Sequence, residues 1–252
     1  MKDIHRRLPV LVMSAQSLLF GIDHHLNFVT SWLKNGSSHK ADILTIFGIG
    51  GIGKTSLAKH VYRLHCREFQ SSSCIEDISR RCDGKFNGLL DVQKQLCDDI
   101  SKTSSIQIRD VSTYTSRIEN LVSCKRVLLV LDAIDTIHQL DALLGSKGFH
   151  PGSKIIITTK DKWLTKSCGL FKTNIKPNYV ELFLQGLHKI QSLRLFCLHA
   201  FTCNHPKTGF EEVSDKLEEY CQGHPLALEV LGKSLHNQDL FYWEGFIEGL
   251  KM

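Results

Sequence analysis

The sequence lacks several features that would place it in a special class of protein. No apolar run approaches the ~18 residues that a membrane helix requires, so we predict no membrane span. No block of five or more like charges occurs, and the formal net charge is only +5 at pH 7. Nucleic-acid binding usually needs a strongly basic face, so we do not expect a nucleic acid as partner.

The nine cysteines form no C-x-x-C pair, and their odd number and irregular spacing argue against a disulfide framework. Free thiols are typical of a reducing compartment, so we expect the cytoplasm, with the nucleus as the alternative. At the N-terminus, basic residues precede the short apolar run LPVLVMSA, which loosely resembles a secretory signal. Because that run is short and contains Pro9, we interpret residues 1–20 as a linker or extension.

Strand-like and helix-like segments alternate through the first two thirds of the chain. The predicted strands are 41–48, 71–78, 126–132, 153–159 and 178–184. Between them, apolar residues recur at helical spacing in 54–65, 88–100 and 114–122. This alternation predicts an α/β fold, with a mostly parallel sheet covered by helices on both faces.

The pattern becomes purely helical near residue 187. Segments 188–201, 209–223, 225–237 and 242–250 all have helical spacing, and Pro225 stands where a helix can begin without losing a hydrogen bond. We therefore expect an α/β nucleotide-binding domain at 21–185 and a small all-helical subdomain at 186–252.

The segment GIGGIGKTS, residues 48–56, follows the first predicted strand and begins a helix. It matches G-x-x-x-x-G-K-[ST], the phosphate-binding loop of nucleoside triphosphatases, in the strand-loop-helix context that the motif requires. Glycines let successive backbone amides point at phosphate oxygens, and the helix adds the positive end of its dipole. The lysine would reach the β- and γ-phosphates, and the threonine would ligate Mg²⁺. The predicted phosphate-binding residues are Gly48, Gly50, Gly51, Gly53, Lys54, Thr55 and Ser56.

An acid at the end of the strand VLLVL completes the predicted magnesium site. Asp132 is the carboxylate expected to hold Mg²⁺ together with Thr55, although a helix cap or turn is an alternative role for it. Hydrolytic P-loop proteins often carry a second acid next to this one, which polarises the attacking water. Here that position is Ala133, and Asp135 is only a weak candidate for the missing group. Losing a positioned base removes about 10²- to 10⁴-fold in rate, so we expect at most a slow ATPase.

Five motifs in one order resemble the NB-ARC module of plant immune receptors that carry an N-terminal TIR domain. They are GIGGIGKTSLAK, RVLLVLDAID, GSKIIITTKDK, HAF and CQGHPLALEVLG, and the resemblance covers roughly residues 20–252. It implies a STAND or AAA+-like ATP/ADP switch, in which a winged-helix part and leucine-rich repeats follow. Because the sequence stops before those parts, we expect a truncated or fragmentary member.

The resemblance also implies roles for individual residues. Ile22 would lie on the adenine side, Pro225 against the base, and Lys160 where the family usually has an arginine that senses the γ-phosphate. Three positions depart from the family pattern: Ala133 replaces an acid, Lys160 an arginine, and His224 a leucine. A lysine keeps the charge but not the bidentate fork, so γ-phosphate sensing should weaken.

These observations favour an ADP- or ATP-binding switch in defence signalling that holds its nucleotide with Mg²⁺, with other proteins or full-length receptors as partners. An active AAA+-type ATPase and a non-binding interaction decoy are the alternatives. A GTPase is disfavoured, since no [NT]-K-x-D guanine motif occurs.

Overall fold

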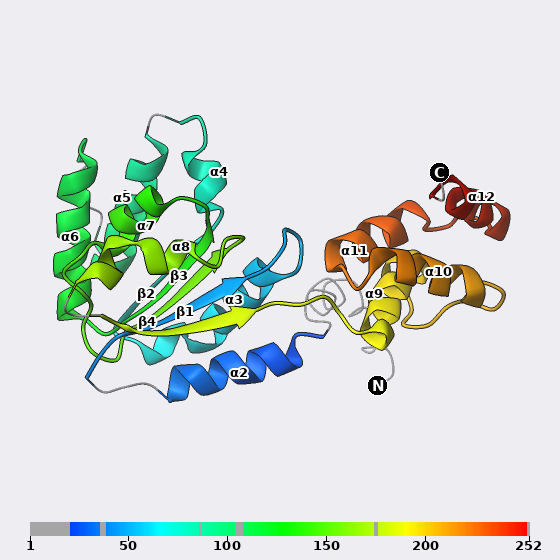
Figure 1. Cartoon of the computed structure of the whole chain (residues 1–252), viewed down its shortest axis with the longest axis horizontal. Coiled ribbons are helices and arrows are strands. Elements are labelled where there is room, and N and C mark those ends of the chain that lie inside the picture. Colours follow the sequence, from blue (N-terminus) through cyan, green and yellow to red (C-terminus); the bar gives the residue numbers. More distant parts are fainter. Residues whose placement is uncertain (1–20, 36–38, 86, 104–107, 174–175, 251–252) are drawn as a thin grey trace, which may run out of the picture. The chain divides into compact units, whose positions relative to one another are not determined.

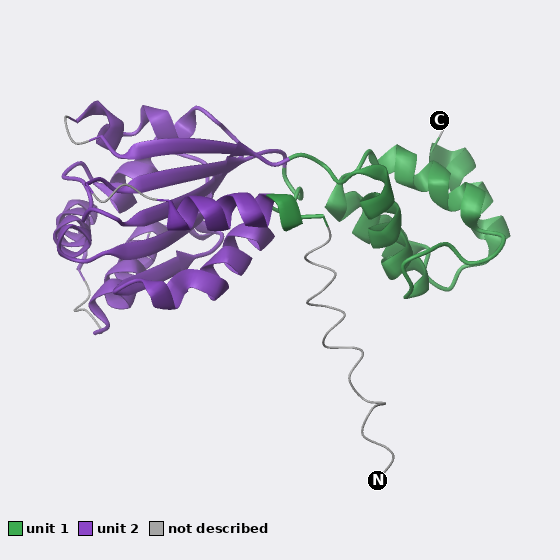
Figure 2. Cartoon of the chain, turned by 90° about the horizontal axis from the view of Figure 1, so that it is seen from below, with its two compact units in different colours: residues 1–24, 50–53, 185–252 green, residues 25–49, 54–184 purple. Residues whose placement is uncertain are grey.

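The computed structural model describes residues 21–35, 39–85, 87–103, 108–173 and 176–250, and the expected linker at 1–20 lies outside these ranges. The chain forms two compact units (Figure 2). Of the described residues, one unit contains those in 25–49 and 54–184, and the other contains 21–24, the short segment 50–53, and 185–250. The expected domain boundaries at 20/21 and 185/186 stay predictions.

The larger unit is built on one parallel sheet of 5 strands, in the order β2-β3-β4-β1-β5. The strands are β1 (Asp42–Phe47), β2 (Ser71–Ile75), β3 (Val127–Ile134), β4 (Lys154–Thr159) and β5 (Asn178–Phe183). After β1 the chain crosses to β2 at one edge of the sheet, and after β4 it crosses to β5 at the opposite edge. The direction of these crossover connections therefore reverses between the neighbouring strands β1 and β4. Ligands of open α/β sheets bind at the carboxyl ends of the strands beside such a reversal.

Helices cover both faces of this sheet, as the sequence predicts (Figure 1). Ile43, Leu129 and Ile155 belong to one buried cluster with the buried apolar residues of α5 (Gly88–Ser101), α6 (Val111–Cys124) and α7 (Ile137–Leu144). On the other face, α3 (Lys54–His65) contacts β3 and β4 and buries Leu57, Ala58 and Val61. Near-continuous apolar strands are expected when both faces of a parallel sheet are covered. The predicted α/β fold class is confirmed.

Helix α2 (Asp23–Lys34), which the sequence analysis did not predict, is tied to the sheet through Lys154. The Lys154 ammonium forms a 2.8 Å ion pair with Asp42 and donates to the Trp32 carbonyl at 2.8 Å. The same ammonium lies 4.6 Å from the centre of the Trp32 ring. These contacts compensate a charge pair that is almost fully buried.

The second predicted strand was too long. Residues 71–78 were expected to be extended, but β2 ends at Ile75 and the short helix α4 (Ile78–Cys82) follows. Asp77, two residues beyond the end of β2, has φ +52°, a left-handed conformation that an extended strand does not contain. Further short elements that the sequence did not predict are α8 (Leu164–Ser167) and two 3₁₀ helices, Cys66–Glu68 and Gly169–Lys172.

The smaller unit is helical, as predicted. It contains α9 (Lys189–Phe201), α10 (Glu211–Cys221), α11 (Pro225–Ser234) and α12 (Leu240–Leu250). Trp243 is fully buried and stacks on Phe201 with ring centres 5.1 Å apart, while Phe196 meets it edge-on. Gly223 has φ +73°, and a Cβ there would lie 2.3 Å from the Leu187 carbonyl oxygen, so only glycine fits between α10 and α11. Within the described ranges, no helix has both the length and the apolar character of a membrane span.

Candidate nucleotide-binding site

The phosphate-binding loop joins the end of β1 to the start of α3. Gly51 and Gly53 have φ values of +74° and +102°, which side-chain-bearing residues rarely adopt. The helix begins directly at Lys54, so its first unpaired amides and its dipole face the loop. These residues therefore form the strand, curled loop and helix start that anion binding requires.

Lys54 folds back across this loop. Its ammonium donates to the carbonyls of Gly48, at 2.8 Å, and Ile49, at 2.7 Å. Burial lowers the pKa of Lys54 from 10.5, the positive charge of Lys160 lowers it further, and Asp132 acts in the opposite direction. Phosphate oxygens would offer the ammonium stronger, charge-assisted partners than these neutral carbonyls.

Asp132 lies at the carboxyl end of β3 and is 0% exposed. Its Oδ1 accepts hydrogen bonds from the Thr55 hydroxyl, at 2.7 Å, and the Thr158 hydroxyl, at 2.6 Å. The backbone N–H of Asp77 donates to Oδ2 at 3.4 Å. The alternative role of Asp132 as a helix cap does not apply, because Thr136 caps α7. The two residues predicted to hold magnesium, Thr55 and Asp132, are thus in direct contact.

Thr158 is a site residue that the sequence analysis missed. Its hydroxyl accepts from the Ala133 N–H at 2.8 Å while it donates to Asp132. This bridge spans a β-bulge between Leu131 and Ile134, in which Ala133 has φ +57°. The composition of the strand KIIITT does not single out Thr158, since Lys154 and Thr159 are polar as well.

Asp135, the weak candidate for the missing acid, has a different partner. Its carboxylate accepts a short hydrogen bond from the hydroxyl of Ser79, and its backbone N–H donates to the side chain of Gln139. Gln139 and Thr136 complete the capping box of α7. The structure therefore assigns Asp135 to the junction with α4 and the start of α7.

The other predicted site residues differ in their surroundings. Lys160 is exposed just beyond β4, near enough to Lys54 to lower its pKa, and Ser56 is half-buried in the first turn of α3. Ile22, which is 7% exposed, and Pro225, the first residue of α11, belong to the helical unit. His224 accepts from the Ala227 N–H through Nδ1 and so caps α11, which a leucine could not do.

Comparison with known proteins identifies the family. The NB-ARC domain family matches residues 22–205. The chain belongs to the NB-ARC family. This confirms the resemblance inferred from the five motifs.

Relatives of this NB-ARC chain include two plant proteins named for resistance. Disease resistance protein RUN1 of Vitis rotundifolia is 36% identical over 252 residues, which cover 98% of this chain and 18% of that protein. TMV resistance protein N of Nicotiana glutinosa is 32% identical over 259 residues, covering 99% of this chain and 21% of that protein. The chain thus spans about a fifth of the length of these relatives.

Solved structures show the fold of the NB-ARC chain. Cdc6p from Pyrobaculum aerophilum superimposes with a TM-score of 0.54 at 16% identity, covering 91% of this chain and 62% of that one. The ORC1 protein of Aeropyrum pernix, solved in complex with DNA, gives 0.55 at 14% identity, covering 93% and 69%. At this identity the likeness establishes the P-loop NTPase fold alone.

The Thr158 bridge gives a stability prediction. Thr158→Val removes the acceptor of the Ala133 N–H and one donor to a fully buried carboxylate, with little change in volume. We expect the free energy of unfolding to fall by about 1–3 kcal/mol, measured by urea denaturation. Thr158→Ser keeps the hydroxyl and should be distinctly more stable than the valine variant. A valine variant as stable as the native chain would show that the bridge contributes nothing.

The lowered pKa of Lys54 gives a pH prediction for ADP binding. Only the charged form of the Lys54 ammonium attracts phosphate, and the pKa of this group lies below 10.5. The affinity for ADP should therefore begin to fall at a lower pH than it would with a lysine of ordinary pKa. Lys160→Met removes a positive neighbour, which raises the pKa of Lys54 and moves the decline to higher pH. The measurement is a titration with a fluorescent ADP analogue from neutral into alkaline pH. Lys162→Met, which removes an exposed lysine that is no cause of the shift, is the matched control. Identical profiles for native protein and Lys160→Met would contradict the assignment.

Proposed function

We propose that this chain binds an adenine nucleotide, with ADP as the resting ligand, and serves as the nucleotide-switch module of a plant immune receptor. The observation that carries the proposal is the contact between the first turn of α3 and the end of β3, where Thr55 meets the buried Asp132 at 2.7 Å. This contact joins the phosphate-binding loop to an acid that is otherwise costly to bury. A site for a phosphate-bound cation gives that acid a function.

Magnesium fits the donor set at this contact. Mg²⁺ prefers oxygen ligands and is usually held by one or two protein oxygens plus phosphates and water. The Thr55 hydroxyl and the Asp132 carboxylate supply such oxygens, and Thr158 fixes the carboxylate from the other side. Bound there with the nucleotide, magnesium would neutralise phosphate charge.

In this proposal, the remaining predicted residues contact different parts of the nucleotide. The phosphates are bound by the Lys54 ammonium and by the backbone amides of the loop glycines, Gly48, Gly50, Gly51 and Gly53. Ser56 is a further hydrogen-bond donor to them. Lys160 senses the γ-phosphate by charge. Ile22 and Pro225 contact the adenine side. The roles at the phosphate groups are supported by the geometry of the loop. The roles at the adenine base are supported by the family resemblance.

We favour a protein that holds its nucleotide over one that hydrolyses it, because no acid follows Asp132 in β3. Ala133 has no charge or lone pair in its side chain, and Asp135 is engaged by Ser79. A bound nucleotide would therefore persist, as a switch requires. The defence role rests on the names of the relatives, and other proteins or full-length receptors would read the bound state.

The nucleotide carried by the purified protein tests the proposal. Protein purified without added nucleotide should release close to one equivalent of ADP on denaturation, identified by mass spectrometry. Lys54→Ala should carry much less, because it removes the charge that folds across the loop. Lys59→Ala is the matched control, since Lys59 lies on the same helix but pairs with Glu76 instead of the loop. A native protein that carries no nucleotide and cannot be loaded with ADP would reject the function and favour a decoy.

A further inference from the structure

Four acidic residues, Glu76, Asp77, Asp132 and Asp135, lie near the carboxyl ends of β2 and β3. The last aligned pair of these parallel strands is Ile75 with Leu131, so Glu76 and Asp77 leave β2 at the level at which Asp132 and Ala133 continue β3. Asp135 follows one residue after β3 ends. Asp77 lies two residues beyond the end of β2, and its backbone N–H reaches the carboxylate of Asp132, the residue before Ala133.

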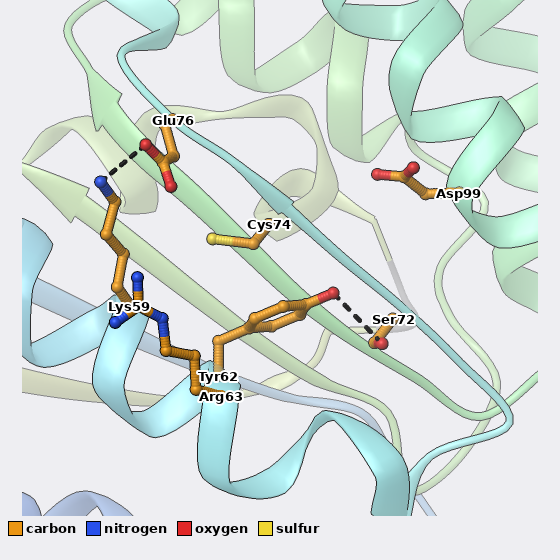
Figure 3. A pocket seen from close by; sticks show the side chains of 7 residues that line it. All are labelled: Lys59, Tyr62, Arg63, Ser72, Cys74, Glu76 and Asp99. Atoms are coloured by element: carbon orange, nitrogen blue, oxygen red, sulfur yellow. Dashed lines mark hydrogen bonds and ion pairs between the residues drawn. The ribbon is translucent and has the colours of Figure 1, made fainter.

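Three of these four carboxylates have partners. Asp132 accepts from Thr55 and Thr158, and Asp135 accepts from Ser79. Glu76 forms a 2.6 Å ion pair with Lys59, beside a pocket of about 370 Å³ (Figure 3). Asp132 therefore belongs to the site, whereas Glu76 and Asp135 are engaged outside it by Lys59 and Ser79.

Asp77 is the exception. Within the described part of the chain its carboxylate has no hydrogen bond or ion pair, and the residue is exposed. It stands at the N-cap of α4, yet its side chain makes no capping bond. Its only contact with the site is through the backbone, whose N–H donates to Asp132 Oδ2. Neither capping nor pairing therefore accounts for an acid at this position.

The backbone of Asp77 is also strained. Its φ of +52° is a left-handed conformation, which is unfavourable for most non-glycine residues and persists where the surrounding structure imposes it. The hydrogen bond to Asp132 is one such constraint. This hydrogen bond holds the backbone of Asp77, whose carboxylate is unpaired and exposed, beside the candidate magnesium ligand Asp132.

We propose that Asp77 is the general base for slow ATP hydrolysis at this site, in place of the acid missing at position 133. This inference rests on the proposed nucleotide-binding function. In the step, a water oxygen bonds to the γ-phosphorus as the bond from that phosphorus to the bridging oxygen of ADP breaks. ADP leaves with the electron pair, and the Asp77 carboxylate takes one proton from the water. The products are ADP and inorganic phosphate.

The test compares phosphate release from ATP by native protein, Asp77→Asn, Glu76→Gln and Lys54→Ala. Asparagine tolerates the left-handed conformation, so the fold is preserved while the base is lost. We expect Asp77→Asn to lower kcat by about 10²-fold, the typical effect of losing a general base. Glu76→Gln, which changes the adjacent exposed acid, should leave kcat within about threefold of native, well inside that loss.

Two measurements distinguish a general-base role of Asp77 from a purely structural one. ADP affinity should be unchanged in Asp77→Asn, and protein incubated with ATP should retain more ATP than the native chain does. The double variant Asp77→Asn/Ala133→Asp should recover turnover, because it restores an acid next to Asp132.

Three outcomes would overturn the inference. They are equal turnover in native protein and Asp77→Asn, a larger loss in Glu76→Gln, and native turnover no greater than that of Lys54→Ala. If ADP still binds, none of these outcomes contradicts the proposed nucleotide-binding function. Failure of ADP to bind would reject both.

Discussion

The structure depends on one buried carboxylate. Asp132 is fully enclosed, and burying a charge without partners costs several kcal/mol, so the groups around it must satisfy it. Thr55 reaches it from α3, Thr158 from β4, and the Asp77 N–H from the end of β2. One side chain thereby fixes the first turn of the phosphate-loop helix relative to three neighbouring strands. The same contacts point its oxygen atoms toward the position where a nucleotide-bound cation is expected.

Strain is concentrated around this carboxylate. Ala133 and Asp77 both have left-handed backbone conformations, and both contribute backbone N–H groups to the network, one to Thr158 and one to Asp132 itself. Aspartate tolerates this conformation better than alanine does. The backbone at position 133 is therefore well suited to the acid that the family usually has there. The substitution removes a charge but leaves the local chain path that would present it.

Most of the fold could be predicted from the sequence because each strand is a short apolar run and each long helix has a clear period. The phosphate loop could be predicted because glycine, lysine and threonine are required at fixed spacing. Helix α2, the end of β2 and the Thr158 bridge could not be, because each depends on contacts between residues distant in the sequence. Asp135 shows the same limit: the sequence made it only a weak candidate for the missing acid, and its hydrogen bond with Ser79 on α4 could not be foreseen. The pairing of β2 with β3 brings Asp77 to the site, and no spacing within either segment reveals that.

We propose that the loop, Lys54 and the Asp132 network together form a working nucleotide site. The most direct measurement is the free energy of unfolding as a function of ADP concentration, with magnesium present. A ligand that binds only the folded chain stabilises it by about 2.7 kcal/mol at 100 times its dissociation constant. We predict a rise that follows this logarithmic dependence in the native chain and is largely lost in Lys54→Ala. An unfolding free energy that does not change with ADP, up to millimolar concentrations, would show that these residues do not form an ADP site.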